Sequence, residues 1–237
     1  MILSNENIYS LVKAIIRKES RGGVFTPDDF NLRFPVLVRE RYDYKKGEME
    51  RTSDITEDME HYLASSTPVY NSGGTYTKPT NFEKHLGAMT VYGGVYRPLD
   101  LITRMEYTQL NSLTQPTLRN PVMYYENGVY HVKPPTSQGV QIHYMVSPAE
   151  PFLDYYYDSN RNIVFMAVDA TLAEGAGTLK TGSVFTDGEY TSETVECDLA
   201  DSDKIAVMYM LLKQYGVSLP DEMLLQYGMN EQLKSER

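Results

Sequence analysis

The chain has 237 residues, a formal net charge of −10 at pH 7, one cysteine and no tryptophan. The single Cys197 excludes an intramolecular disulfide and a cysteine-rich zinc site, which suits a reducing cytoplasm. The first six residues lack the basic and apolar regions of a signal peptide, and no stretch approaches the ~20 apolar residues of a membrane span. We therefore expect a protein that is soluble and intracellular when made, with no membrane partner.

The acidic excess is concentrated in the last third of the chain. Residues 150–237 hold 16 Asp and Glu against 6 Lys and Arg. The plainer interpretation is a solvated acidic face that keeps the protein soluble. The alternative is a surface along which DNA passes without sticking, because phosphate contacts depend on Lys and Arg.

Residues 1–64 predict a group of short helices. The first runs from Asn5 to Ser20, and its apolar stripe comprises Ile8, Leu11, Val12, Ile15 and Ile16. The second starts at Thr26-Pro27, where Thr26 is a suitable N-cap and Pro27 a suitable first residue. Pro35 is expected to kink or split this helix, because proline has no backbone donor. A third helix is predicted over 54–64, with Ile55, Met59, Tyr62 and Leu63 facing inward.

The region 65–198 reads as β structure. Asn127-Gly128 is a strong two-residue turn signal, because both positions tolerate a positive φ. It joins predicted strands at 122–125 and 129–133, and the alternation of Val140, Ile142, Tyr144 and Val146 predicts a third. We expect these three strands to form an antiparallel meander.

The other segments of this region give a mixed prediction of strands, loops and turns. Extended structure is expected at 91–92, 95–96, 99–105 and 163–168, whereas 106–113 fits either a helix or a loop. Residues 171–196 contain three glycines by Gly182 and an Asp187-Gly188 turn. We interpret this stretch as a hairpin that leaves the sheet.

The chain becomes helical again over 199–237. Asp201-Ser202 can cap a helix whose inward residues are Ile205, Met208, Leu211, Leu212 and Tyr215. Gly216 suits the position after its end, and a last helix is predicted from Ser218. The predicted class is therefore α+β: helices of 1–64 and 199–237 pack together as a bundle, with a central antiparallel β region at 65–198.

No pattern of chemical side chains stands out. The histidines (His61, His85, His131 and His143) have no metal-ligand spacing, although His131 and His143 lie on predicted neighbouring strands. Asp154, Asp158, Asn160 and Asn162 resemble a calcium loop only in part, because the central Gly and the terminal Glu are missing. We therefore predict no metal site and no cofactor, and interpret the histidines as strand-surface residues.

Nucleophile and phosphate motifs are also incomplete. Residues 175–181 include Lys180 but lack the glycine that precedes the lysine of a P-loop, so we expect a flexible loop. Ser183 has no flanking glycines of a nucleophile elbow. Cys197 lies between Glu196 and Asp198, which raises a thiol pKa. We predict that the protein is not an enzyme and has no catalytic residues.

Tyrosine is abundant, with 20 residues, and Tyr155-Tyr156-Tyr157 is the densest run. Tyrosine on strands commonly packs a half-buried face. It also favours protein interfaces, because it offers a large contact area at low entropic cost. Stacking on sugars is a third interpretation, weakened by the absence of tryptophan.

Three stretches resemble structural proteins of tailed phages that infect Bacteroidetes, including the crAss-like group. The first is the helix from Ile8 to Ile16 followed by 23–31, with a "T-P-x-x-F-N" helix start at Thr26 to Asn31. The second is 111–151, with prolines at 116, 121, 134 and 148. The third is 205–228, with Gly216-Val217-Ser218-Leu219 and Gln226-Tyr227-Gly228. The stretch at 171–190 looks like an insertion relative to that family.

The resemblance implies a ring-forming protein of the portal-to-tail connector, a structural part of the virion assembled in the host cytoplasm. Its expected partners are copies of itself, 12 by analogy with such connectors, and the portal or a neighbouring ring of the tail. DNA would pass through the channel during genome ejection without sequence-specific binding. The helices at 5–64 and 201–235 would form the body of the ring, and the hairpin at 171–196 a contact with the next layer.

Two other function classes remain open from the residues. One is a tail-associated module that binds host glycans through its tyrosines. The other is a tail-associated glycosidase, which needs two carboxylates roughly 5–9.5 Å apart in a cleft.

Overall fold

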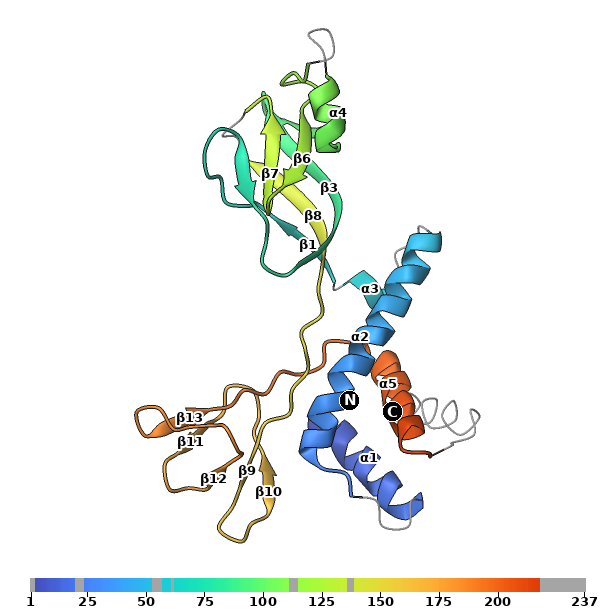
Figure 1. The fold of residues 1–237 in the computed structure, drawn as a ribbon, viewed down its shortest axis with the longest axis vertical. Coiled ribbons are helices and arrows are strands. Elements are labelled where there is room, and N and C mark those ends of the chain that lie inside the picture. Colours follow the sequence, from blue (N-terminus) through green and yellow to red (C-terminus); the bar gives the residue numbers. More distant parts are fainter. Residues whose placement is uncertain are drawn as a thin grey trace. The chain divides into compact units, whose positions relative to one another are not determined.

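The computed structural model describes residues 3–19, 24–52, 57–60, 62–110, 115–135 and 139–217. The chain forms two compact units (Figure 1). Unit 1 combines Met1–Asp54 with Pro148–Arg237, and unit 2 is Ile55–Ser147. The fold is mixed α+β, as expected. The predicted β region 65–198 is shared between the units, since its part up to Ser147 lies in unit 2 and the remainder in unit 1.

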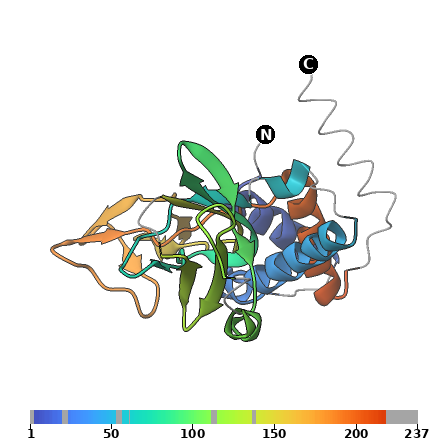
Figure 2. The same cartoon turned by 90° about the horizontal axis from the view of Figure 1, so that it is seen from above.

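The helices of unit 1 come from both parts of the chain that build it. They are α1 (Asn5–Glu19), α2 (Pro27–Thr52) and α5 (Asp201–Gln214). Helix α5 packs against both α1 and α2, which the views in Figures 1 and 2 also show. The predicted packing of the two helical regions on each other is thus confirmed for α5. The last predicted helix, from Ser218, lies outside the described residues.

The local signals at the first two helices work as predicted. Ile8, Val12 and Ile16 of α1 are buried. At the start of α2 the Asp29 N–H donates to the Thr26 hydroxyl at 3.1 Å, and the Thr26 N–H donates to the Asp29 carboxylate at 3.0 Å. This reciprocal cap satisfies two backbone donors that the helix leaves open.

Two details of the N-terminal helices differ from the expectations. Of the two outcomes expected at Pro35, a kink or a split, the split does not occur: helix α2 continues to Thr52, and a buried apolar face spans the proline. That face comprises Phe30, Phe34, Leu37, Val38 and Tyr42. Of the third helix, the described residues show α3 over Glu57–Glu60, and its predicted end is wrong, because Leu63 begins strand β1 (Leu63–Ser66) instead. Pairing of β1 with a distant strand overrides the local helical pattern there.

The described part of unit 2 comprises two four-stranded sheets and two short helices, α3 and α4 (Arg104–Gln109). In the first sheet the order is β1 (Leu63–Ser66), β8 (Val140–Val146), β3 (Phe82–Tyr92) and β4 (Val95–Pro98). In the second it is β2 (Thr75–Thr77), β7 (Val129–Lys133), β6 (Val122–Glu126) and β5 (Asp100–Leu101). All neighbours are antiparallel except β5 and β6.

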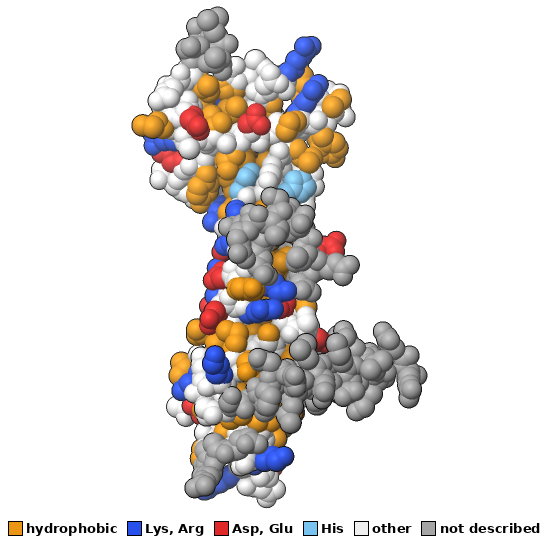
Figure 3. Space-filling model, turned by 90° about the vertical axis from the view of Figure 1, so that its right-hand side faces the viewer, with side chains coloured by type: hydrophobic (Ala, Val, Ile, Leu, Met, Phe, Trp, Pro, Cys, Tyr) orange, Lys and Arg blue, Asp and Glu red, His pale blue; other side chains and the backbone are white. Residues whose placement is uncertain are grey.

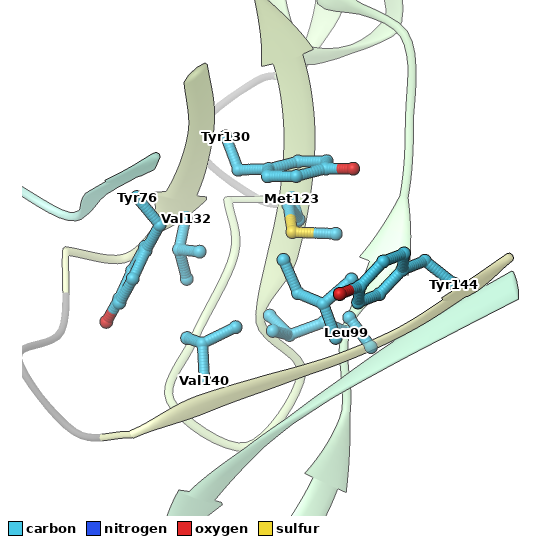
Figure 4. Packing of buried hydrophobic residues seen from close by; sticks show 9 residues of the cluster. Tyr76, Leu99, Met123, Tyr130, Val132, Val140 and Tyr144 are labelled. Carbon is cyan, nitrogen blue, oxygen red and sulfur yellow. The ribbon is translucent and has the colours of Figure 1, made fainter. Parts of the chain in front are cut away.

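The predicted hairpin in unit 2 is confirmed and the predicted meander is wrong. Strands β6 and β7 pair around Asn127 and Gly128, whose φ values are +52° and +80°. Strand β8 does not pair with β7; it lies between β1 and β3 in the other sheet. The Val140, Ile142 and Tyr144 side chains of β8 are buried as the alternation predicts. They meet Leu99, Met123 and Tyr130 in one core between the sheets (Figure 4).

The remaining strands lie in unit 1 and are short. Strand β9 (Tyr155–Tyr157) pairs with β10 (Ile163–Phe165) and with β12 (Thr178–Leu179). Strand β11 (Thr171–Ala173) pairs with β13 (Glu189–Thr191) in a separate two-stranded ladder. The predicted hairpin at 171–196 is therefore present, with β12 at its middle attached to β9.

The two ends of α5 differ in how well the sequence predicts them. Its N-cap is Ala200, with no side-chain cap, and Asp201 is its first helical residue. The Asp201 carboxylate instead accepts a hydrogen bond from the Leu3 N–H at 3.2 Å, so a contact with a distant segment replaces the predicted cap. At the other end Gly216 has a φ of +75°, as predicted.

Candidate functional site

Two asparagines fasten extended segments to the helices of unit 1. The buried Asn5 side chain donates to the Val195 carbonyl at 2.8 Å and accepts from the Cys197 N–H at 3.2 Å. Asn31 of α2 donates to the Leu153 carbonyl at 2.9 Å and accepts from the N–H of the same residue at 2.8 Å. Each side-chain amide thus pairs with one backbone carbonyl and one backbone N–H, as a neighbouring β-strand would. These bonds satisfy backbone groups that burial would otherwise leave unpaired.

The hairpin at 171–196 is held by a buried carboxylate, Asp154, whose side chain is fully enclosed. The Lys180 ammonium lies 2.8 Å from its Oδ1 atom. The Tyr190 hydroxyl and the Glu193 N–H donate to Oδ2 at 2.7 and 2.9 Å. Lys180 also lies over the Phe152 ring, 4.0 Å from its centroid. One charged centre therefore joins β9 to three points of the hairpin.

The electrostatics of Asp154 indicate a structural role. Burial alone raises the pKa of this carboxyl, but hydrogen bonds from Lys180, the Glu193 backbone and Tyr190, with the Lys180 charge, lower it below its ordinary 3.8. Both oxygens are engaged by protein donors. The residues 175–181 therefore do not offer Lys180 to a phosphate, because its ammonium is bound within the fold.

A pocket of about 430 Å³ opens in unit 1 between α1, the start of α2 and the β9–β10 hairpin. Lys13 and Arg17, one helical turn apart on α1, contribute its positive charge, and Tyr9, Phe25 and Tyr157 its aromatic walls. The Lys13 ammonium lies over the Tyr9 ring, 5.1 Å from the centroid. We call this feature the basic pocket.

The basic pocket contains one acid, Asp28, which accepts a hydrogen bond from the Tyr155 hydroxyl at 2.9 Å. Among the described residues, no carboxylate lies within ion-pair distance of Lys13 or Arg17. Burial and the Arg17 charge together lower the pKa of Lys13, and burial raises the pKa of Tyr9 to about 12. The arrangement can therefore attract an anionic group between cations and aromatic rings.

A second surface runs along the outer side of α2. Residues 28, 32, 36, 40 and 44 follow one another at spacing four and are all exposed. Three of them are large and apolar: Leu32 is 72% exposed, Val36 64% and Tyr44 54%. We call Leu32, Val36 and Tyr44 the outer α2 stripe. On the face drawn in Figure 3, described acidic and basic side chains are interspersed with hydrophobic ones.

The predicted histidine neighbours are not brought together. His131 lies on β7 and stacks on Tyr124 with the rings 4.7 Å apart, whereas His143 lies on β8 in the other sheet. His143 is instead near His85, and burial together with the His143 charge lowers the pKa of His85. His61 lies outside the described residues.

The partial calcium loop is closed by its own hydrogen bonds. The Asp158 carboxylate accepts from the N–H groups of Asn160 and Asn162, both at 2.8 Å, and lies in the turn between β9 and β10. These bonds, the Asn162 backbone first, lower the pKa of Asp158. Asp154 belongs to the separate buried centre described above, so the four residues form no common ligand set.

Cys197 is buried in the fold, and Ser183 hydrogen-bonds to a neighbouring tyrosine. Burial, more than the neighbouring acids, raises the pKa of the Cys197 thiol to about 11. The sequence therefore predicts the direction of this shift but not its main cause. The Ser183 hydroxyl donates to the Tyr190 hydroxyl at 3.4 Å.

The sequence reasoning missed the basic pocket, although part of its signal is readable. Lys13 and Arg17 stand at spacing four on the polar face of the predicted first helix, which reads as an ordinary solvated face. The approach of Tyr155 and Tyr157 to that face depends on residues more than a hundred positions away.

Within the described ranges, no three His, Cys, Asp or Glu side chains gather as a metal site would require. No helix found there is long and apolar enough to cross a membrane. No protein-family model matches this chain, and no curated protein sequence matches it significantly.

Proposed function

We propose that the chain is a structural virion protein whose copies assemble side by side into a ring of the portal-to-tail connector of a tailed phage. In this role it takes part in head–tail joining and surrounds the channel through which the genome leaves. Its partners are sibling copies, expected to number 12, and the portal or a neighbouring tail ring. The resemblance of three sequence stretches to such proteins motivates the proposal. The structural observation that supports it is the outer α2 stripe.

The outer α2 stripe is unusual for the solvent side of a helix. A surface helix normally presents polar residues there, and apolar rows that remain exposed often mark interaction sites. Burying Leu32 and Val36 against a neighbour would contribute about 1.5–3 kcal/mol each. The occupant we propose is a second copy, because ring closure needs one patch of each subunit to dock on a different patch of the next.

The charge distribution supports the proposed channel. The acidic excess of residues 150–237 would disfavour phosphate binding wherever these residues line the bore, so that DNA slides through. On this proposal the protein acts by assembly and by shape, with no reaction of its own.

The test is the oligomeric state of the full chain. Leu32→Asp with Val36→Asp should convert the assembled wild type to smaller species, as measured by mass photometry. Val69→Asp, a charge introduced at another exposed valine, is the matched control and should leave assembly intact. A wild-type chain that stays monomeric at all concentrations, and that is missing from a reconstruction of the virion, would end the proposal.

A glycan-binding module is the second candidate, favoured by exposed tyrosines in unit 2. Tyr96 is 65% exposed, Tyr125 44% and Tyr70 41%. Exposed rings of this kind can stack on sugars. Binding of the isolated protein to a glycan array, lost in Tyr96→Ala, would support this candidate; an array without signal would exclude it.

A further inference from the structure

Three exposed carboxylates gather at one end of the β11–β13 ladder. Glu189 is the first residue of β13 and pairs with Ala173, the last residue of β11. The next residue, Glu174, donates its N–H to the Gly188 carbonyl at 2.8 Å, and Asp187 precedes that glycine in the turn. Glu174, Asp187 and Glu189 are all exposed. We call these three residues the acidic end.

The acidic end has no cation of its own. Among the described residues, no Lys or Arg lies within ion-pair distance of its three carboxylates. The nearby Lys180 is engaged by Asp154 and by Glu193, the latter at 3.2 Å. An exposed apolar side chain, Val184, stands three residues before Asp187 and is 72% exposed. The loop that leads to the acidic end thus carries an exposed apolar residue as well as negative charge.

The basic pocket offers the complementary features. Its two cations lack carboxylate partners among the described residues, and its wall includes Tyr157 and the exposed Val24. A volume of about 430 Å³ falls in the range of ligand-sized clefts, so it can take side chains of a hairpin end. Asp28 in the pocket is held by Tyr155, on the β9 side of the opening.

We propose that the basic pocket of one copy receives the acidic end of a neighbouring copy. This inference rests on the proposed ring function and specifies one of its contacts. Within unit 1, β11 and β13 extend away from α1 in both Figure 1 and Figure 2, so the acidic end serves a neighbour and not its own pocket. Two different patches then meet at each junction, which is the heterologous geometry of a ring.

Charge reversal on each side tests the contact with the full chain. The first variant, K13E with R17E, makes the pocket negative. The second, D187K with E189K, makes the acidic end positive. Each variant alone opposes like charges at every junction, so the concentration for half-assembly should rise roughly tenfold or more. Mixed in equal amounts, the two should co-assemble in alternation, because each then meets an opposite charge.

Controls separate the possible outcomes. Lys18→Glu reverses a neighbouring exposed charge on α1 outside the pocket and should assemble as the wild type does. Far-ultraviolet circular dichroism checks that each variant is folded. Unchanged assembly of both variants, or losses that mixing does not restore, would overturn the contact while the ring itself stands. A wild type that never assembles would refute the proposed function instead.

Discussion

Replacing Asp154 by alanine should release the hairpin at 171–196 from β9. The substitution leaves the Lys180 ammonium, which is 13% exposed, without its buried partner and removes the acceptor of Tyr190 and the Glu193 N–H. Removing one partner of a buried ion pair costs about 3–5 kcal/mol. We expect the lower end, about 3 kcal/mol, because Lys180 keeps its contact with the Glu193 carboxylate.

Hydrogen exchange measured by mass spectrometry is the suitable assay, because it reports on β11 and β13 separately from unit 2. Protection of these strands should fall roughly a hundredfold in Asp154→Ala, while the β6–β7 hairpin keeps its protection. Glu193→Ala removes the exposed partner of the same lysine and should cost less than about 1 kcal/mol. Equal losses in the two variants would refute the argument that burial sets the strength of this centre.

Three further outcomes are expected. Asn31→Ala should lower the free energy of unfolding of unit 1 by about 2–4 kcal/mol in urea titrations, because two buried backbone groups of Leu153 lose their partner. Gly177→Ala should destabilise β12, seen as faster hydrogen exchange there, since the added Cβ atom would overlap the Tyr156 ring and lie 2.9 Å from the Tyr157 carbonyl oxygen. Because folding lowers the pKa of Asp154, its contribution to stability is present above the unfolded value of 3.8 and is lost as the pH falls through the lower folded value. The free energies of unfolding of wild type and Asp154→Asn should therefore converge in urea titrations as the pH is lowered past 3.8.

Local signals in the sequence predicted much of the helical part of the fold. The apolar stripe of α1, the Thr26 cap and the Gly216 end depend on residues within a few positions of one another, and they formed as predicted. The Asn127-Gly128 hairpin has the same origin. Patterns of this kind act over one turn of chain, so composition and spacing suffice to predict them.

Strand partners were harder to predict, because pairing is decided by distant segments. The alternation in β8 correctly predicts which side chains are buried, but it does not predict the neighbouring strands. Strand β8 pairs with β1 and β3 and not with β7, which precedes it in the sequence. The same limit applies to the sites. Nothing near Lys180 in the sequence indicates Asp154, and the Tyr155 hydroxyl meets Asp28 across 127 positions.

The Asn5 contacts have a consequence for the order in which the protein is made. Unit 2 is continuous in sequence and can acquire its core as soon as residue 147 has left the ribosome. Asn5, by contrast, must wait for Glu196, 191 positions later, whose carboxylate accepts its N–H at 2.8 Å. Unit 1 therefore completes its fold only after unit 2 has been translated, and a nascent chain exposes α1 and α2 without their α5 cover until residues 201–214 have been made.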